Sequence, residues 1–325
     1  RLSPHRIGMV GKKRSTEEWG DTVAEEEALP RSKRLVPSSN IPAAVPQPQA
    51  KLYQKITPSS SSKKTSYDRR EEAGHLAVQA GQVLGDRFTV RSLLGEGTFG
   101  KVWQCNDAKH GDVVAVKCVR KIDRYISSAK IEAKILRQIY YSQEAARVEL
   151  LVKLFTTFWH QGHYCMVFEP LGRSLLDYIQ ENQYRGFPLH YVRAISAQVL
   201  SALAFLHVNS LVHTDLKLEN VLFVPGEDVT MEVEVLSMRD GNSGRSSHKG
   251  PERICLPRCP NVKLIDFGGA TFNDERKSSI INTRQYRGPE VTLELGWSYP
   301  SDGWSAACII AEKFTGDLLD STHDN

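Results

Sequence analysis

The most informative part of the sequence is His213-Thr214-Asp215-Leu216-Lys217-Leu218-Glu219-Asn220, and Asp266-Phe267-Gly268 follows about 50 residues later. At this spacing an Asp can accept or orient a hydroxyl proton, a Lys two places on can meet phosphate charge, and an Asn five places on can hold a metal ion. The ordinary role of a loop Asp is to cap a helix or close a turn. Several matching residues in the right order along the chain instead indicate phosphoryl-transfer chemistry.

A glycine-rich string, Gly95-Glu96-Gly97-Thr98-Phe99-Gly100, lies about 17 residues before Ala115-Val116-Lys117. Glycines let the backbone approach phosphate oxygens closely and present N–H groups to them. In a dinucleotide-binding fold a helix follows such a string directly. Here a second predicted strand follows, which favours a loop that covers phosphates between two strands.

Strand alternation places Ala115 and Lys117 on one face, so the small Ala leaves room for an adenine ring and Lys117 can reach phosphates. A buried Lys needs a counter-charge. Glu132 is the only acid between residues 127 and 140, and Ile135 and Leu136 place it on the inward side of a predicted helix. The alternative is a surface Lys and a surface Glu, which the surrounding motifs disfavour.

Hydrophobic periodicity predicts a strand-rich first half and a helical second half. Strands are expected near 88–94, 113–119, 151–155, 164–168 and 262–265. Helices are expected at 127–140, 174–181, 189–208 and 301–313, and an irregular polar insertion at about 225–260.

The chain resembles eukaryotic protein kinases and, within them, the LAMMER family of dual-specificity kinases that includes the CDC-like kinases. Thr214 before Asp215, together with Gly296-Trp297-Ser298 and Thr322-His323-Asp324, carries the closer resemblance, because most protein kinases have Arg at the position of Thr214. Further supporting strings are Lys263-Leu264-Ile265-Asp266-Phe267-Gly268 and Thr283-Arg284-Gln285-Tyr286-Arg287-Gly288-Pro289-Glu290.

This resemblance implies an α+β, bilobal protein kinase fold over residues 83–325. The N-lobe, 83–170, would be a β-sheet with one main helix, and the C-lobe, 171–325, would be mostly α-helical. The sequence ends before the segment that names the family, so we expect a C-terminally truncated, incomplete C-lobe and low stability. Residues 1–82 are expected to form a disordered, basic, Ser/Pro-rich tail.

The resemblance also implies roles for individual residues in ATP and Mg²⁺ binding. Asp215 would be the catalytic base, Lys217 a γ-phosphate contact, and Lys117 with Glu132 the phosphate-anchoring ion pair. Asn220 and Asp266 would hold Mg²⁺. The nucleotide would contact Gly95, Glu96, Gly97, Thr98, Phe99, Gly100, Val102, Ala115, Lys117, Phe168, Glu169, Leu171 and Leu222.

Thr214 carries a regulatory expectation. An Arg at this position normally pairs with a phosphorylated activation loop, and Thr cannot form that pair. We therefore expect activity that does not need the loop phosphate. Gly269 stands where the family has Ser, directly after the Asp-Phe-Gly.

Charge is uneven along the chain. Residues 1–80 hold 14 Lys/Arg and 9 Asp/Glu, a net charge of +5, so the total of +4 leaves −1 for the remainder. Short basic clusters at 12–14 and 31–34 resemble nuclear-import signals, although solvated linker charge has the same appearance. The six Cys are scattered, which favours reduced thiols over a zinc site at Cys255 and Cys259.

The favoured function is ATP-dependent transfer of phosphate to Ser, Thr or Tyr of protein substrates, and the resemblance implies Arg/Ser-rich splicing factors. We expect a monomer in the nucleus, with the cytoplasm as a second compartment, and no direct contact with nucleic acid or membrane. One alternative is a kinase-like scaffold with little activity. Another is a kinase of the wider group that holds the cyclin-dependent and mitogen-activated kinases.

Overall fold

The structure is a computed structural model and describes residues 74–140, 148–233, 252–275 and 278–319. Most of the predicted tail, with both basic clusters, and the terminal Thr322-His323-Asp324 lie outside the described residues. All positions of the predicted phosphoryl-transfer site lie inside them.

The first lobe is built on a six-stranded sheet with the order β1-β2-β3-β4-β6-β5, in which neighbours pair antiparallel. Hydrophobic and β-branched residues dominate β4, and every residue of β6 is buried. The strands are β1 (Val83–Leu84), β2 (Phe88–Gly97), β3 (Gly100–Asp107), β4 (Val113–Val119), β5 (Leu154–His160) and β6 (His163–Phe168).

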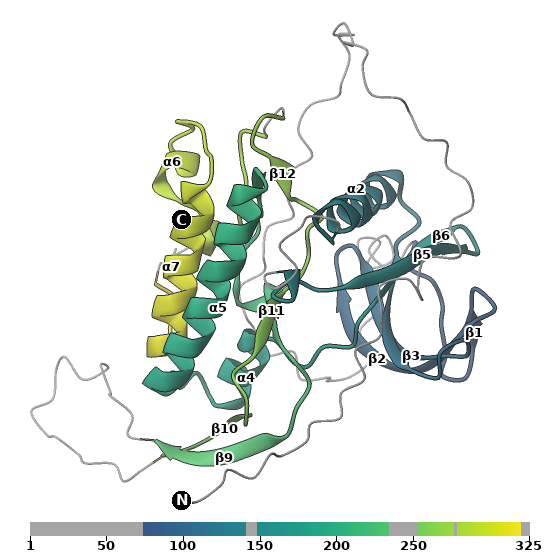
Figure 1. The fold of residues 1–325 in the computed structure, drawn as a ribbon, viewed down its shortest axis with the longest axis horizontal. Coiled ribbons are helices and arrows are strands. Elements are labelled where there is room, and N and C mark those ends of the chain that lie inside the picture. The colour runs from purple at the N-terminus through teal and green to yellow at the C-terminus, as the bar shows by residue number, and fades with distance from the viewer. Residues whose placement is uncertain (1–73, 141–147, 234–251, 276–277, 320–325) are drawn as a thin grey trace, which may run out of the picture. The chain divides into compact units, whose positions relative to one another are not determined.

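Helix α2 (Asp123–Tyr140) lies against one side of this sheet, as Figure 1 shows. Its buried residues, among them Ala129, Ile135 and Leu136, recur at helical spacing and form its inner face. The helix begins four residues before the predicted start. Asp123 lies in its first turn, where a carboxylate interacts favourably with the helix dipole.

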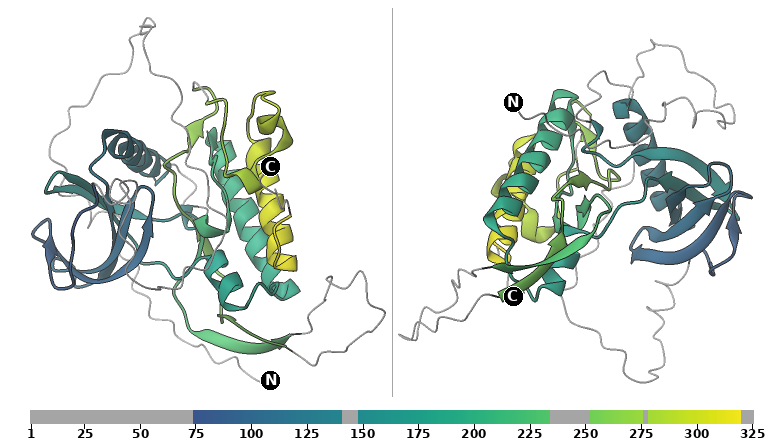
Figure 2. Two further views of the ribbon diagram at one scale, coloured as in Figure 1. Left: turned by 180° about the vertical axis from the view of Figure 1, so that it is seen from behind. Right: turned by 60° about the horizontal axis from the view of Figure 1, so that its bottom comes forward.

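The second lobe is led by α5 (Leu189–Val208) and α7 (Pro300–Thr315), which lie side by side in Figures 1 and 2. Helix α4 (Leu175–Glu181) begins with a capping box, in which Ser174 and Asp177 bond each other's backbone N–H. Further elements of this lobe are β7 (Leu211–Val212), η2 (Leu218–Asn220), β8 (Val221–Phe223), β11 (Val262–Leu264), β12 (Thr271–Phe272), η3 (Arg284–Tyr286) and α6 (Pro289–Thr292).

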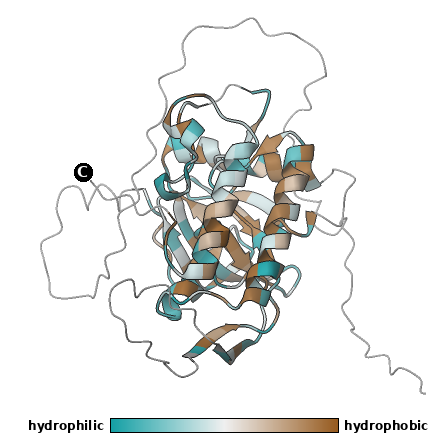
Figure 3. Cartoon of the chain, turned by 90° about the vertical axis from the view of Figure 1, so that its left-hand side faces the viewer, coloured by the Kyte–Doolittle hydropathy of each residue, from teal (hydrophilic) through white to brown (hydrophobic). Residues whose placement is uncertain are grey.

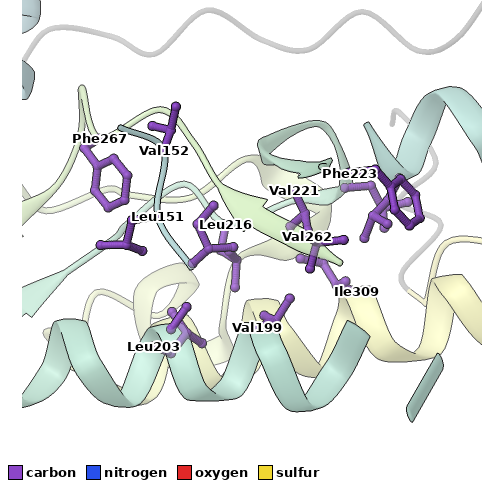
Figure 4. Packing of buried hydrophobic residues seen from close by; sticks show 14 of the residues in the cluster. Leu151, Val152, Val199, Leu203, Leu216, Val221, Phe223, Val262, Phe267 and Ile309 are labelled. Carbon is purple, nitrogen blue, oxygen red and sulfur yellow. The ribbon is translucent and has the colours of Figure 1, made fainter. Parts of the chain in front are cut away.

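The core of the second lobe lies between α5 and two short antiparallel pairs, β8 with β11 and β7 with β12. Figure 4 shows Val199 and Leu203 of α5 pointing toward Leu216 and toward the strands that carry Val221 and Val262. These strands hold the ends of the loops from which Asp215 and Asp266 project. Apolar packing of α5 therefore sets where the two carboxylates lie.

The sequence predicts an irregular insertion at about 225–260, and the structure differs over its described parts. Strands β9 (Asp228–Val233) and β10 (Glu252–Pro257) form an antiparallel hairpin. Ile254 and Leu256 of β10 are buried, and the alternation in these short runs was masked by the polar residues around them. The side-chain amide of Asn182 binds both the N–H and the carbonyl of Cys255, which ties the hairpin to the end of α4.

Three other boundaries differ from the predicted ones. Residues 74–82, assigned to the tail, belong to the ordered lobe, where Leu76 is buried and Gly81 N–H bonds Val90 O. The strand expected at 151–155 begins at Leu154, because Leu151 instead bridges to Leu264 of the second lobe. Strand β2 runs on to Gly97, so the glycine-rich string forms the tip of a hairpin.

Helix α5 is long and apolar enough, by length and composition alone, to cross a membrane. Its buried residues pack against β7, β11 and α7, as in the central helix of a folded lobe. Figure 3 shows hydrophobic segments both on the long helices and on the strands that they cover.

A lysine, Lys313, is fully buried in α7. Within the described residues its ammonium bonds only a neutral hydroxyl, Ser196 Oγ, at 3.2 Å. Burial lowers the pKa of Lys313 to about 7. A buried charge without an opposite charge is costly, so this side chain should destabilise the fold at neutral pH.

We expect Lys313→Met to raise the free energy of unfolding by about 1 kcal/mol or more at pH 7, measured by urea denaturation. The pKa of Lys313 is lower in the folded state, so the cost of burying it falls as pH rises from about 7 toward 10.5. The advantage of the variant should shrink over this window. Lys134→Met, at an exposed position of α2, is the control. A destabilised Lys313→Met protein would contradict the expectation.

Candidate active site

The loop that carries Asp215 is anchored by a buried carboxylate. Asp302, at the start of α7, is fully buried and accepts hydrogen bonds from the backbone N–H of His213 at 2.9 Å and of Thr214 at 3.0 Å. His207 Nε2 of α5 lies 2.9 Å from the same carboxylate. The loop after β7 is therefore tied to both long helices.

Thr214 has a left-handed backbone, with φ of 68°. This conformation is unfavourable for a β-branched residue and costs on the order of 1–3 kcal/mol. The two bonds to Asp302 offset this strain. The Thr214 hydroxyl donates to Gly269 O at 2.7 Å, and a Cβ on Gly269 would come within 2.8 Å of that hydroxyl. The Gly at position 269 therefore permits this close contact.

Three side chains hold Asp215, two through its carboxylate and one through its backbone carbonyl. Lys217 Nζ donates to Oδ2 at 2.7 Å, Thr283 Oγ1 donates to Oδ1 at 2.8 Å, and Lys217 also donates to Thr283. Asn220 Nδ2 bonds the Asp215 carbonyl at 2.7 Å. Asp215, Lys217 and Asn220, singled out by sequence spacing, are thus one hydrogen-bonded group. Burial opposes the charge of Lys217, but Asp215 outweighs it and raises the pKa of Lys217.

Asp266 follows β11 and also has a left-handed backbone, with φ of 62°. The next side chain, Phe267, is fully buried, and its ring centroid lies 5.1 Å from that of His213. Burial opposes ionisation of Asp266, but Lys117, Lys217 and His213 outweigh it and hold its pKa below the usual value. A side chain that stays ionised in this position suits cation binding.

Lys117 of β4 forms the ion pair that the sequence predicts. Its ammonium lies 2.8 Å from Glu132 Oε2 of α2 and 3.7 Å from Asp266 Oδ1. Burial opposes the charge of Lys117, but the two carboxylates outweigh it and raise its pKa. The Lys117 ammonium therefore connects the sheet, helix α2 and the Asp266 segment.

The glycine-rich string lies at the turn between β2 and β3. A Cβ on Gly100 would come 2.2 Å from Cys118 O, so only Gly lets β3 approach β4 there. Glu96 pairs with Lys101 across the hairpin at 3.3 Å, and Arg120 donates to Thr98 O in the turn at 3.3 Å. Gly95, Gly97, Thr98 and Phe99 are exposed.

The residues predicted to surround adenine come from the sheet of the first lobe, from the segment after β6 and from β8. Ala115 pairs with Phe168 across β4 and β6, and both are largely buried. Val102, Leu171 and Leu222 are half-buried on β3, after β6 and on β8. Glu169 lies at the predicted hinge, where its carboxylate binds Lys263 Nζ and the N–H of Lys153.

These residues fit a nucleoside triphosphate with a divalent cation. Among the described residues no cluster of three or more His, Cys, Asp or Glu could hold a metal alone. Asp266 and Asn220 supply two oxygen ligands, and Mg²⁺ is typically held by one or two carboxylates together with substrate phosphates. When bound, the cation would neutralise charge on the phosphates. Lys117 and Lys217 would supply positive charge to the phosphates.

Three site residues had not been identified from sequence. Asp302 anchors the loop, Thr283 orients Asp215, and Ser128 donates from α2 to Gly268 O at 2.8 Å. Thr283 begins the Thr283–Glu290 string, whose resemblance to kinases implies no role for it. The other two are far in sequence from the residues that they position, so no local pattern marks them.

Comparisons with known proteins agree with this geometry. Residues 88–325 match the family model described as protein kinase domain. Human "Dual specificity protein kinase CLK2" is 42% identical over 253 residues, covering 78% of this chain and 48% of that protein. Arabidopsis thaliana "Serine/threonine-protein kinase AFC1" is 39% identical over 256 residues, covering 78% and 53%.

A solved crystal structure of a kinase domain superposes with a TM-score of 0.70 at 40% identity, covering 77% of this chain and 71% of that one. The chain spans about half the length of the curated relatives that it matches. The relatives confirm the resemblance to the CDC-like kinases, and the family model with the solved structure confirms the kinase fold.

We expect Asp266→Asn to weaken the affinity for ADP at least tenfold when Mg²⁺ is present and to change it little in EDTA, because the lost charge faces the cation. Titration calorimetry would measure both affinities. Asp274→Asn, at an exposed position eight residues on, is the matched control. Equal weakening with and without Mg²⁺ would show that Asp266 acts without a metal.

Proposed function

Since this chain belongs to the protein kinase family, we propose that it transfers the γ-phosphate of ATP to Ser, Thr and Tyr residues of protein substrates, with Mg²⁺ as the cation. The observation that carries this proposal is the assembly of four charged side chains from four separate segments. Lys117 contacts both Glu132 and Asp266, and Asp215 lies in the same hydrogen-bonded loop as Asn220.

In this proposal Asp215 acts as the general base. Its carboxylate is partly exposed and held by Lys217 and Thr283, so it can accept the proton of a substrate hydroxyl without rearranging. Lys217 lies 2.7 Å from the same carboxylate, where it would meet charge on the transferred phosphoryl group. Positioning and charge neutralisation are what this class of reaction needs from a protein.

The substrate class is proposed from the resemblance to the CDC-like kinases. We propose Arg/Ser-rich proteins as substrates and Tyr as an additional acceptor. The two basic clusters before residue 35 support a location in the nucleus, with the cytoplasm as a second compartment. One chain supplies every residue of the described site, which supports a monomeric enzyme.

The test is phosphate transfer from ATP to an Arg/Ser-repeat peptide by the full-length protein, with Asp215→Asn as the catalytic control. We expect a drop in kcat of at least 100-fold in the variant, because the positioned base is lost. A matched Lys/Ala-substituted peptide tests the substrate class. Equal rates on both peptides would contradict Arg/Ser recognition, and no transfer by the wild type would favour the scaffold.

We expect phosphatase treatment to change the rate by less than about twofold. Thr214 carries no charge to pair with a loop phosphate, and its hydroxyl already binds Gly269 O. Mass spectrometry would verify the loss of phosphate from residues 266–290. A rate that collapses on treatment and returns after preincubation with MgATP would contradict this expectation.

A further inference from the structure

Ser128 of helix α2 contacts the segment that carries Asp266. Its hydroxyl donates to Gly268 O at 2.8 Å across 140 positions of sequence. Ser128 lies four residues before Glu132, so both side chains project from the same side of the helix. The helix therefore reaches the Asp266 segment directly through Ser128 and indirectly through Glu132 and Lys117.

A second hydroxyl holds the next carbonyl along the chain. Thr214 donates to Gly269 O at 2.7 Å from the loop that carries Asp215. The consecutive carbonyls of Gly268 and Gly269 are thus held from two different segments. We call Ser128, Thr214 and these two carbonyls the hydroxyl clamp.

The clamp acts on two consecutive glycines, a residue type with more backbone freedom than any other. Gly268 and Gly269 can adopt conformations closed to other residues, and Asp266 just before them has the unfavourable φ of 62°. A Cβ at Gly268 would lie 3.2 Å from Ser128 Oγ, so the hydroxyl packs closely over this glycine. Hydrogen bonds to the two carbonyls limit the freedom that the glycines allow.

The bond from Ser128 also restrains α2 relative to the segment that carries Asp266. Phosphoryl transfer in kinases requires both the Lys–Glu ion pair and the metal-binding Asp to be in place. Glu132 is carried by α2, and Asp266 comes two residues before Gly268. One hydrogen bond therefore restrains both partners of Lys117 together.

We propose that Ser128 is a positioning residue, which holds helix α2 and Asp266 in the arrangement that binds MgATP. This inference rests on the proposed kinase function. It explains how the site is ordered without a charged pair between Thr214 and a loop phosphate.

The test compares wild type, Ser128→Ala, Ser128→Thr and Ser127→Ala in the full-length protein. Ser127 is exposed on the same turn and provides the matched control. Steady-state kinetics would give kcat and the KM values for MgATP and peptide. Calorimetry would give MgADP affinity, and hydrogen exchange would report on residues 266–275.

We expect Ser128→Ala to lower kcat/KM for MgATP and the MgADP affinity about 3- to 10-fold, the size of one neutral hydrogen bond. The KM for peptide should stay within twofold, and exchange in residues 266–275 should be faster. Ser128→Thr, which keeps the hydroxyl, should restore both values to within twofold of wild type. Ser127→Ala should match wild type.

Helix unfolding is not an expected consequence of these changes, because Ala favours a helix more than Ser does. The proposal is overturned if Ser128→Ala behaves as wild type, if Ser128→Thr is equally impaired, or if Ser127→Ala shows the same loss. If the wild type transfers no phosphate, the proposed function fails. In that case the MgADP affinity and the hydrogen exchange of the same four proteins still test the positioning role of Ser128.

Discussion

The carboxylate of Asp302 is the constraint on which the site depends. It is fully buried, and a buried carboxylate is tolerated only when it is well bonded. Two backbone N–H groups and His207 supply those bonds. In return the carboxylate holds Thr214 in its left-handed conformation, and Asp215 projects from the next position. The catalytic loop therefore takes its geometry from helix α7, which lies about 90 residues later in the chain.

The other half of the site depends on contacts between the sheet lobe and the Asp266 segment. Lys117 pairs with Glu132 of α2 and lies 3.7 Å from Asp266, and Ser128 bonds the carbonyl of Gly268. Leu151 bridges to Leu264, directly before the Ile265-Asp266 pair. Charge, hydroxyl and backbone contacts thus converge on one short segment. A change in the position of α2 would move the Lys117 pair and the metal ligand together.

Much of this could be predicted from sequence, because short motifs carry their own geometry. The spacing of Asp215, Lys217 and Asn220 fits a single tight turn, and the structure joins them by hydrogen bonds. Strand alternation predicts that Lys117 lies on the same face of β4 as Ala115. Helical spacing predicts that Glu132 lies on the inward side of α2. The sequence does not predict the hairpin of β9 and β10, because polar residues surround its two strands and Asn182 fixes its edge from a distance. Helix α2 begins at Asp123, four residues before the predicted start.

The sequence by itself determined the chemical groups, their order, and the strands and helices that carry most of them. It did so because phosphate-binding loops, buried strands and amphipathic helices depend on residues close together in the chain. Only the tertiary structure decided which groups hold the others in place. Asp302, Thr283 and Ser128 act across long stretches of sequence. Their hydrogen bonds exist only once packing has brought α7, the Thr283 segment and α2 to the catalytic residues.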